Sequence, residues 1–320
     1  MTRHARTLTA IGALAASAAL TLSLSACGGP SAPQPGDAQT DGAASSIPDT
    51  SALLDGVGAD DALVAMVPST ISDAGQLVVG SNVQSPPNNF YAADGSTVVG
   101  SDHDLITAIA KKLGLDVQYE NQDFGSLITS LQSGRVDVTI AAMNDTAERQ
   151  QAIDFVDYLT SGITIMVQKD NPAGITGPDT LCGHSVAVVT GTSQQEFAES
   201  TSADCTADGK EAVEVVVTDS DSQNQTQLRT GRIDAIVNDL PSAVYISQTT
   251  QDGNAFEVVP GDVIDGAPYG IGVNKDNAGL RDAMAQALDA LIDDGTYAEI
   301  LDSWGISSGA VTEAVVNGGK

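Results

Sequence analysis

A short pattern occurs twice in this chain and constrains its fold more than any other feature. The first copy is Leu131-Gln-Ser-Gly-Arg-Val-Asp-Val138 and the second is Leu228-Arg-Thr-Gly-Arg-Ile-Asp-Ala235. Gly134 is suited to ending a helix, because glycine adopts the left-handed conformation found there without strain. The apolar residues that follow predict a buried strand. Each copy then leads to a polar pair, Asn144-Asp145 or Asn238-Asp239, and this repetition indicates two similar α/β lobes.

Strands and helices alternate in both halves, which predicts a mainly parallel sheet flanked by helices in each lobe. The final helices need a surface to cover, so the chain is expected to return to the first lobe. It would then cross between lobes near 160–168 and 265–273, and two crossings make a hinge that permits closure. The expected strands are 76–79, 115–119, 136–142, 163–168, 185–189, 213–217, 232–237 and 267–273, and the expected helices are 102–113, 127–131, 223–228, 280–292 and 298–304.

The N-terminus has the features of an export signal. Arg3 and Arg6 precede an apolar run over 8–24, which is typical of a secretory signal peptide. A membrane anchor is the alternative, but the run is rich in Ala and Thr and short for a span. The run ends in Leu24-Ser-Ala-Cys27, which resembles the lipobox of bacterial lipoproteins. That resemblance implies that Cys27 becomes the lipidated N-terminus, whereas an ordinary signal with a chance cysteine remains the alternative.

The segment after Cys27 is rich in Pro, Gly, Ser, Ala and Asp, so it can bury little and is expected to be flexible. A weak apolar patch, 53–54 and 63–67, could form a short helix or a docking segment there. The expected organisation is a lipoprotein signal peptide (1–26), a flexible tether (27–70), lobe 1 in two parts (71–162 and 268–307), lobe 2 (163–267) and a C-terminal tail (308–320).

The net charge of −29 limits the possible partners. Such a surface repels nucleic acid and opposes electrostatic binding to anionic lipid. Contact with the membrane is therefore expected only through the lipid on Cys27, at the outer face of the cytoplasmic membrane.

Cys182 and Cys205 are the remaining cysteines. An even pair in an exported protein favours a disulfide that closes a surface loop. Two free, buried thiols are the alternative.

Charged and polar residues follow two of the predicted strands. Asp145 with Glu148, and Ser193 with Glu196, are spaced as capping pairs that begin helices. Arg149 would then lie in a first helical turn at the C-terminal edge of a sheet, where ligands of open α/β sheets bind. A guanidinium there is suited to holding a carboxylate. Taken alone, a solvated arginine is the more common interpretation.

A series of short motifs follows in a characteristic order along residues 75–305. The motifs are Gly95 to Gly100 with Asp102, Phe124-Gly-Ser-Leu-Ile128, Leu131 to Asp137, Asp145-Thr-Ala-Glu-Arg149 with Asp154-Phe155, Gly191-Thr-Ser193, Gly231 to Ala235 with Asp239, Tyr269-Gly-Ile271, Asp294-Gly-Thr-Tyr297 and Trp304-Gly305. In this order the chain resembles the extracellular solute-binding proteins of ABC importers, in the branch that carries polar amino acids. The resemblance implies a binding lipoprotein with two lobes that close on a free L-amino acid, act as a monomer, need no cofactor or metal, and deliver the ligand to permease subunits.

The resemblance also implies roles for single residues. Arg149 stands where the family holds the ligand α-carboxylate, and Thr192 and Ser193 stand at the helix N-terminus that also receives it. Asp239 matches the position that takes the α-ammonium. The alternatives are helix capping for Thr192, Ser193 and Asp239. Asn144 stands in a position that often bonds the ligand, and its alternative is a turn residue. Phe124 stands in a position that packs on the ligand, and its alternative is a core residue.

One loop departs from the family pattern. Ser85 and Ser101 stand where aromatic residues are common, and Phe90 or Tyr91 is expected to supply the missing ring. Asn82 is expected to face the ligand side chain. Selectivity for the side chain is therefore expected to reside in the loop 82–91.

A sensing module and an enzyme on the same fold, such as a dehydratase or a cell-wall lyase, are the competing functions. An enzyme needs a general acid or base in the cleft. The nearby Glu148 and Glu196 are better explained as caps, so no catalytic residue is expected. Asp219 and Asp221 lack the glycine and closing glutamate of a calcium loop.

Overall fold

The structure is a computed structural model that describes residues 47–320. The predicted signal peptide, the lipidation site Cys27 and the tether before residue 47 lie outside the described residues. Between residues 47 and 320, no helix is both long enough and apolar enough to cross a bilayer.

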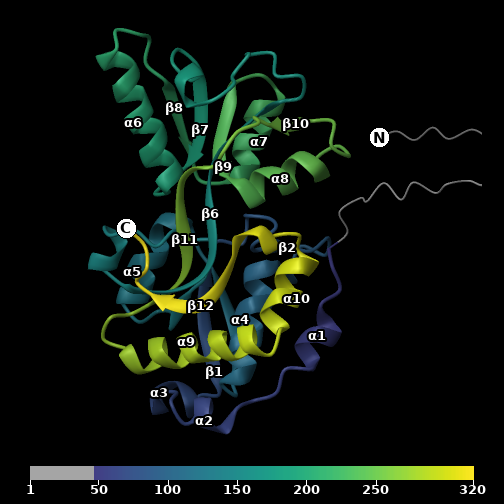
Figure 1. The fold of residues 1–320 in the computed structure, drawn as a ribbon, viewed down its shortest axis with the longest axis vertical. Coiled ribbons are helices and arrows are strands. Elements are labelled where there is room, and N and C mark those ends of the chain that lie inside the picture. Colours follow the sequence, from purple (N-terminus) through teal and green to yellow (C-terminus); the bar gives the residue numbers. More distant parts are fainter. Residues whose placement is uncertain (1–46) are drawn as a thin grey trace, which may run out of the picture. The chain divides into compact units, whose positions relative to one another are not determined.

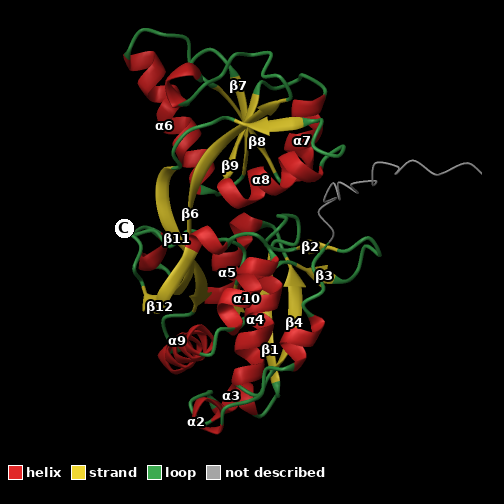
Figure 2. Ribbon diagram, turned by 45° about the vertical axis from the view of Figure 1, so that its right-hand side comes forward, coloured by secondary structure: helices red, strands yellow, loops and turns green. Residues whose placement is uncertain are grey.

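Two lobes are joined by two long strands, β6 (Asp154–Gln168) and β11 (Ile264–Val273), which pair antiparallel with each other (Figures 1 and 2). The N-terminal half of β6 belongs to the sheet of lobe 1, and its C-terminal half pairs with β9 and β10 in lobe 2. These strands pass through the crossings expected near 160–168 and 265–273. They form the hinge strands of the molecule.

In lobe 1, strand β1 lies between β4 and β5 and pairs parallel with both. Helices α4, α9 and α10 bury their apolar side chains against one face of the sheet, and α5 covers the other face (Figure 1). The elements are α1 (Ser51–Asp55), α2 (Asp61–Val64), α3 (Ser69–Ser72), β1 (Gln76–Ser81), β2 (Phe90–Tyr91), β3 (Val98–Val99), α4 (Ser101–Lys112), β4 (Asp116–Asn121), the 3-10 helix η1 (Phe124–Ser126), α5 (Leu127–Gln132), β5 (Val138–Thr139), η2 (Arg149–Gln151), α9 (Ala278–Asp293), α10 (Thr296–Ser303), η4 (Ser307–Gly309) and β12 (Ala310–Val316).

In lobe 2, strand β7 lies between β8 and β9 and pairs parallel with both. Helix α6 packs on one face of this sheet, and α7 and α8 pack on the other. The two-lobed α/β architecture predicted from the sequence is confirmed. The elements are η3 (Pro178–Thr180), β7 (Ser185–Val189), α6 (Ser193–Ala207), β8 (Glu214–Thr218), α7 (Asp221–Arg229), β9 (Ala235–Asp239), α8 (Leu240–Thr249) and β10 (Phe256–Val258).

The repeated pattern has the same structural role in both lobes. Gly134 and Gly231 end their helices with φ angles of 71° and 66°, as predicted for a left-handed cap. The carboxylate of Asp137 accepts a hydrogen bond from the backbone N–H of Val78 at 2.8 Å. The carboxylate of Asp234 accepts one from the N–H of Ser185 at 2.9 Å. Each copy therefore ends a helix and fastens the following strand to the neighbouring parallel strand.

Four expectations need correction. Residues 47–70, expected to be part of a flexible tether, contain α1, α2 and α3 and bury Leu54, Leu63 and Val67 in the core of lobe 1. Regular strand structure in the segment 136–142 is limited to β5. The tail 308–320 contains β12, which adds to the edge of β6. No α-helix follows Asp145: its carboxylate accepts hydrogen bonds from Gln150 and Gly319, and only the turn η2 forms before β6 begins.

Cys182 and Cys205 form a disulfide, with their Cα atoms 5.6 Å apart. The bond ties the loop before β7 to the C-terminal half of α6, and Cys205 is buried in the core of lobe 2. The alternative of two free thiols is therefore wrong for this structure.

Candidate ligand-binding site

A polar cavity lies between the lobes at the C-terminal ends of β1 and β9, and both lobes contribute to its wall. Lobe 1 supplies Asn82, Ser85, Asn88, Phe124, Ala141, Ala142 and Asn144, and lobe 2 supplies Val189, Thr192, Gln194, Asp221, Val237, Asn238, Asp239 and Ser242. This is the edge at which open α/β sheets bind ligands. Five of the predicted binding residues, Asn82, Phe124, Asn144, Thr192 and Asp239, line this cavity.

Arg149 lies next to the cavity and joins the two lobes. Its guanidinium donates to the carbonyl of Asn144 in its own lobe at 2.9 Å and to the carbonyl of Gly191 in lobe 2 at 3.1 Å. Its Cζ lies 5.6 Å from the centre of the Phe124 ring. Burial lowers the pKa of Arg149, although Glu196 and Asp239 oppose that effect. The guanidinium keeps its charge in this half-buried place, since an arginine pKa lies far above neutrality.

The N-terminus of α6 faces lobe 1. Ser193 Oγ donates to Asn144 Oδ1 across the cleft at 2.6 Å. The cap of the helix is Thr192, whose hydroxyl accepts from the N–H of Gln195, so the predicted capping pair of Ser193 and Glu196 is displaced by one residue. Ser193 is thereby free to make the contact between the lobes. The first N–H groups of any helix lack partners within it, so this end is suited to receiving an anion.

Asp239 ends β9 and is 7% exposed. It precedes α8 but makes no capping hydrogen bond with its side chain, so the capping alternative is wrong. Burial raises its pKa to about 7, although Tyr269 and Gln194 lie close enough to lower it. Neither of those groups makes a hydrogen bond of ordinary geometry with it, and its Oδ1 has no partner. A buried carboxylate without a partner is energetically costly unless a ligand supplies one.

A second buried acid, Asp221, was not among the predicted binding residues. It begins α7, is 7% exposed and accepts a hydrogen bond from Asn238 Nδ2 at 3.3 Å. Burial raises its pKa to about 6. An acid at the start of a helix that follows a parallel strand was the available signal. In the sequence, Asp221 is evaluated only as part of a calcium loop, which it does not fit.

The loop 82–91 reaches the cavity through Asn82, Ser85 and Asn88. Its position depends on Gly100, which has a φ of 140° and where a Cβ would collide with the carbonyl of Asn88. That close approach lets the N–H of Asp102, in the first turn of α4, donate to this carbonyl at 3.0 Å. Glycine at position 100 therefore sets the depth at which Asn88 enters the cavity.

The missing aromatic ring is not replaced. Tyr91 is 39% exposed and does not line the cavity, which contradicts its predicted role. Phe90 packs against Tyr245 and Trp304, with ring centroids 5.7 Å and 6.0 Å apart. Both residues belong to the short pair β2–β3, which lies away from the cavity. Phe124 is the aromatic residue in the cavity wall within the described part of the chain.

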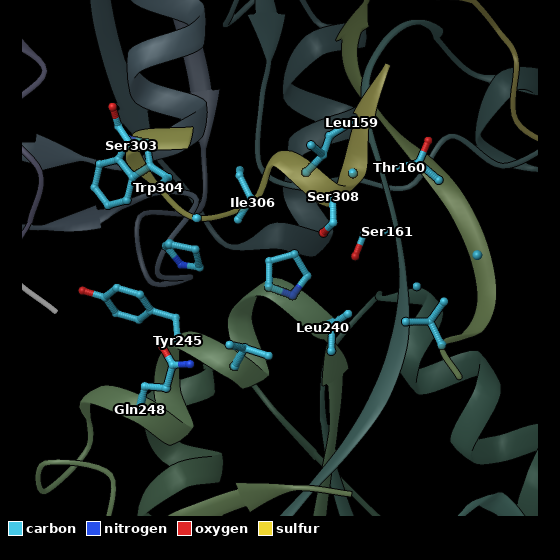
Figure 3. A pocket seen from close by; sticks show the side chains of 18 of the residues that line it. Leu159, Thr160, Ser161, Leu240, Tyr245, Gln248, Ser303, Trp304, Ile306 and Ser308 are labelled. Atoms are coloured by element: carbon cyan, nitrogen blue, oxygen red, sulfur yellow. The ribbon is translucent and has the colours of Figure 1, made fainter. Parts of the chain in front are cut away.

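A larger cavity of about 590 Å³ lies beside the hinge strands (Figure 3). Figure 3 shows Leu159 and Ile306 from lobe 1, and Leu240 and Tyr245 from α8, around it. None of its lining residues carries a formal charge. A free amino acid carries two charges that need partners, so the smaller polar cavity is the better candidate for such a ligand.

The acids around His103 have structural partners. Asp102 accepts from Tyr158, and Asp104 accepts from Thr50 and Trp304. The ring of His103 stacks on Tyr119. Across residues 47–320, no group of three or more His, Cys, Asp or Glu side chains is arranged to hold a metal ion.

The raised pKa values predict how the stability of the ligand-free protein depends on pH. Burial raises the pKa of Asp102 and Asp221 to about 6 and of Asp239 to about 7, so folding favours their protonated forms. The free energy of unfolding should therefore increase as pH falls from about 8 to about 5. Denaturant titrations at these two pH values, in high salt to screen surface repulsion, measure this difference. Equal or lower stability at pH 5 would contradict it.

Known proteins with similar sequences belong to one family of binding proteins. The model of a family described as bacterial extracellular solute-binding proteins, family 3, matches residues 77–307. An arginine-binding protein of Corynebacterium glutamicum is 33% identical over 254 residues, which are 79% of this chain and 82% of that protein.

Similar solved structures include two ancestral proteins. An ancestral arginine-binding protein bound to arginine is 36% identical, with a TM-score of 0.66 over 72% of this chain and 98% of that one. An ancestral amino-acid-binding protein, described as a precursor of cyclohexadienyl dehydratase, is 28% identical, with a TM-score of 0.65 over 74% and 98%.

Proposed function

Because the chain belongs to family 3 of the bacterial extracellular solute-binding proteins, we propose that it captures a free L-amino acid in the cleft between its lobes and delivers it to an ABC importer. The observation that carries this proposal is the pair of opposite charges at one closed cleft: Arg149 from lobe 1 and the unpartnered carboxylate of Asp239 from lobe 2. A zwitterion needs a cationic and an anionic partner at separate points.

In the proposed complex, the α-carboxylate binds Arg149 and the N-terminus of α6, with Thr192 and Ser193, and the α-ammonium binds Asp239. Asn144 and Phe124 complete the wall around the α-groups, and Asn82 faces the side chain. Asn88 donates to Ser242 across the cleft at 3.3 Å, and two further hydrogen bonds, Arg149 to Gly191 and Ser193 to Asn144, join the lobes at the proposed carboxylate site. Opening the lobes frees these donors for the carboxylate, and closure on the ligand makes the closed state the tightly binding one.

We propose that the protein does not consume its ligand. The relatives are named as binding proteins, and the solved neighbour linked to a dehydratase is itself described as amino-acid-binding. Glu196, an acid near the cleft, is exposed in the first turn of α6 and does not line the cavity. The cavity is completed within one chain, which supports action as a monomer.

We also propose that Cys27 carries a lipid that holds the protein to the outer face of the cytoplasmic membrane. The support is the sequence Leu24-Ser-Ala-Cys27 after an apolar run. The wild-type protein should then enter the detergent phase of a Triton X-114 extraction, and Cys27→Ala should move it to the aqueous phase. Equal partitioning of the two proteins would contradict lipidation.

A thermal-shift screen against L-amino acids tests the proposed function. Any bound ligand is first removed by dialysis from denaturant, and the refolded protein is heated with each amino acid in excess. A ligand at 100 times its Kd adds about 2.7 kcal/mol to the free energy of unfolding. Stabilisation by no amino acid would contradict the proposal.

A further inference from the structure

The cavity contains more negative charge than the α-ammonium group of an amino acid can neutralise. Asp221 and Asp239 line it, each 7% exposed, and both come from lobe 2. Among the described residues, no lysine, arginine or histidine forms an ion pair with either acid. Arg149 is near enough to lower the pKa of Asp239, but within the described part of the chain no cationic side chain lies within ion-pair distance of either carboxylate.

Within residues 47–320, Asp221 is buried with one hydrogen bond to its carboxylate and no ion pair. Its carboxylate accepts a hydrogen bond from Asn238, and Asn238 is itself fixed because its Oδ1 accepts from the N–H of Asp239. Asn238 thus holds the two acids side by side. Burial raises the pKa of Asp221, and the charge of Asp221 raises the pKa of Asp239 in turn. The two carboxylates therefore destabilise each other until positive charge enters the cavity.

A count of charges identifies the kind of ligand that would relieve the repulsion between the two carboxylates. This step rests on the proposed function, in which Arg149 pairs with the α-carboxylate and Asp239 with the α-ammonium. Asp221 is then left with no counter-charge. A neutral amino acid would leave a buried carboxylate uncompensated, which is strongly unfavourable. An amino acid with one further positive charge makes the closed site neutral.

Other groups of the cavity wall suit a long side chain with several N–H donors. Lobe 1 contributes the amides of Asn82 and Asn88 and the hydroxyl of Ser85, and lobe 2 contributes Ser242. No other residue of the wall carries a charge that could replace Asp221 as a partner for the end of such a side chain.

We propose that the ligand is an amino acid with a positively charged side chain, and that Asp221 is the residue that binds this charge. Since Asp221 lies in lobe 2, its contact is completed only when that lobe closes over a ligand held by Arg149. Recognition of the side chain and closure are thereby coupled.

Calorimetric titrations with matched ligands test the proposal. L-Arginine and L-citrulline have nearly the same shape, but only arginine has a positively charged side chain. L-Lysine serves as a second ligand with a cationic side chain. The wild-type protein should bind arginine or lysine about 10- to 100-fold more tightly than citrulline, since a hydrogen bond to a charged group is stronger than one to a neutral group. Asp221→Asn should reduce this preference to a few-fold, mainly by weakening the binding of the cation.

Two controls separate recognition from structure. Asp221→Asn keeps a side-chain oxygen that can accept from Asn238, so the variant should fold, which its melting temperature checks. Asp219→Asn removes the same charge from an exposed neighbour and should leave the preference unchanged.

The outcomes are distinct. A wild-type protein that binds no amino acid contradicts the proposed function itself. A wild-type protein that binds neutral amino acids as tightly as cationic ones, or an Asp221→Asn variant that weakens both classes equally, overturns the role of Asp221 and leaves the proposed function standing.

Discussion

Replacing Arg149 with alanine should weaken amino-acid binding by about 1,000-fold, which corresponds to about 4 kcal/mol. The substitution leaves the ligand carboxylate in a closed cleft without a cation, and an unpaired buried charge accounts for most of the loss. It also removes the contacts of Arg149 with Asn144 and Gly191, one of which joins the lobes. Calorimetric titration with the tightest-binding amino acid measures the effect.

Two further variants make this result specific. Arg149→Lys keeps the charge but loses the planar fork that binds both carboxylate oxygens, so its affinity should lie between those of the wild type and the alanine variant. Arg135→Ala removes an arginine of the same lobe whose side chain is 62% exposed, and it should leave affinity unchanged. Wild-type affinity in Arg149→Ala would contradict the assignment of the carboxylate partner.

Asp239→Asn should change stability and binding in opposite directions. The ligand-free protein should become more stable at pH 8, because a buried carboxylate with a raised pKa and an unpartnered oxygen is replaced by a neutral amide. Amino-acid affinity should fall by about 100-fold or more, since the α-ammonium loses its charged partner. Melting curves and titrations on the same preparation measure both effects.

A residue with only a structural role would not give this pair of results. If Asp239 held the fold together, the asparagine variant would lose stability and affinity together, and that outcome would contradict the assignment. Asp252→Asn is a matched control, because Asp252 is an exposed acid in lobe 2 with a φ of 54°, which asparagine tolerates well. It should change neither quantity.

The fold could be predicted from the sequence where local signals agree. The pattern at 131–138 and 228–235 combines a glycine that adopts positive φ with an aspartate that holds a strand, so both helix ends were placed correctly. The strands were placed only in part, because β5 covers two residues of the expected 136–142 and β9 extends to Asp239. The hinge followed from the need of α9 and α10 for a surface to cover. These features depend on residues close in sequence, or on the requirement that the apolar face of a helix be covered by a sheet.

Two predictions were wrong because other segments of the chain decide the outcome. Asp145 has the spacing of a helix cap, but the C-terminal segment returns to it and Gly319 donates to its carboxylate, which no local pattern indicates. Tyr91 belongs to the loop 82–91, yet it pairs with Val98 in β3 and does not line the cavity.

The most informative group of the cavity, Asp221, was missed for the same reason. Its sequence context indicates an ordinary helix start. Its role in binding becomes apparent only because it lies beside Asp239, with Asn238 bonded to both residues. In the sequence, an acid at the C-terminal edge of a strand marks a candidate. Only the structure shows that two such acids share one cavity without a cation.

The central claim is that a closed two-lobed cleft holds one intact amino acid. The most direct measurement is a calorimetric titration of ligand-free protein with the amino acid that stabilises it most, followed by denaturation and mass spectrometry of the released ligand. One binding site per chain is expected, and the amino acid should be recovered chemically unchanged after prolonged incubation. Loss of the amino acid with the appearance of a product, or the absence of saturable binding, would contradict it.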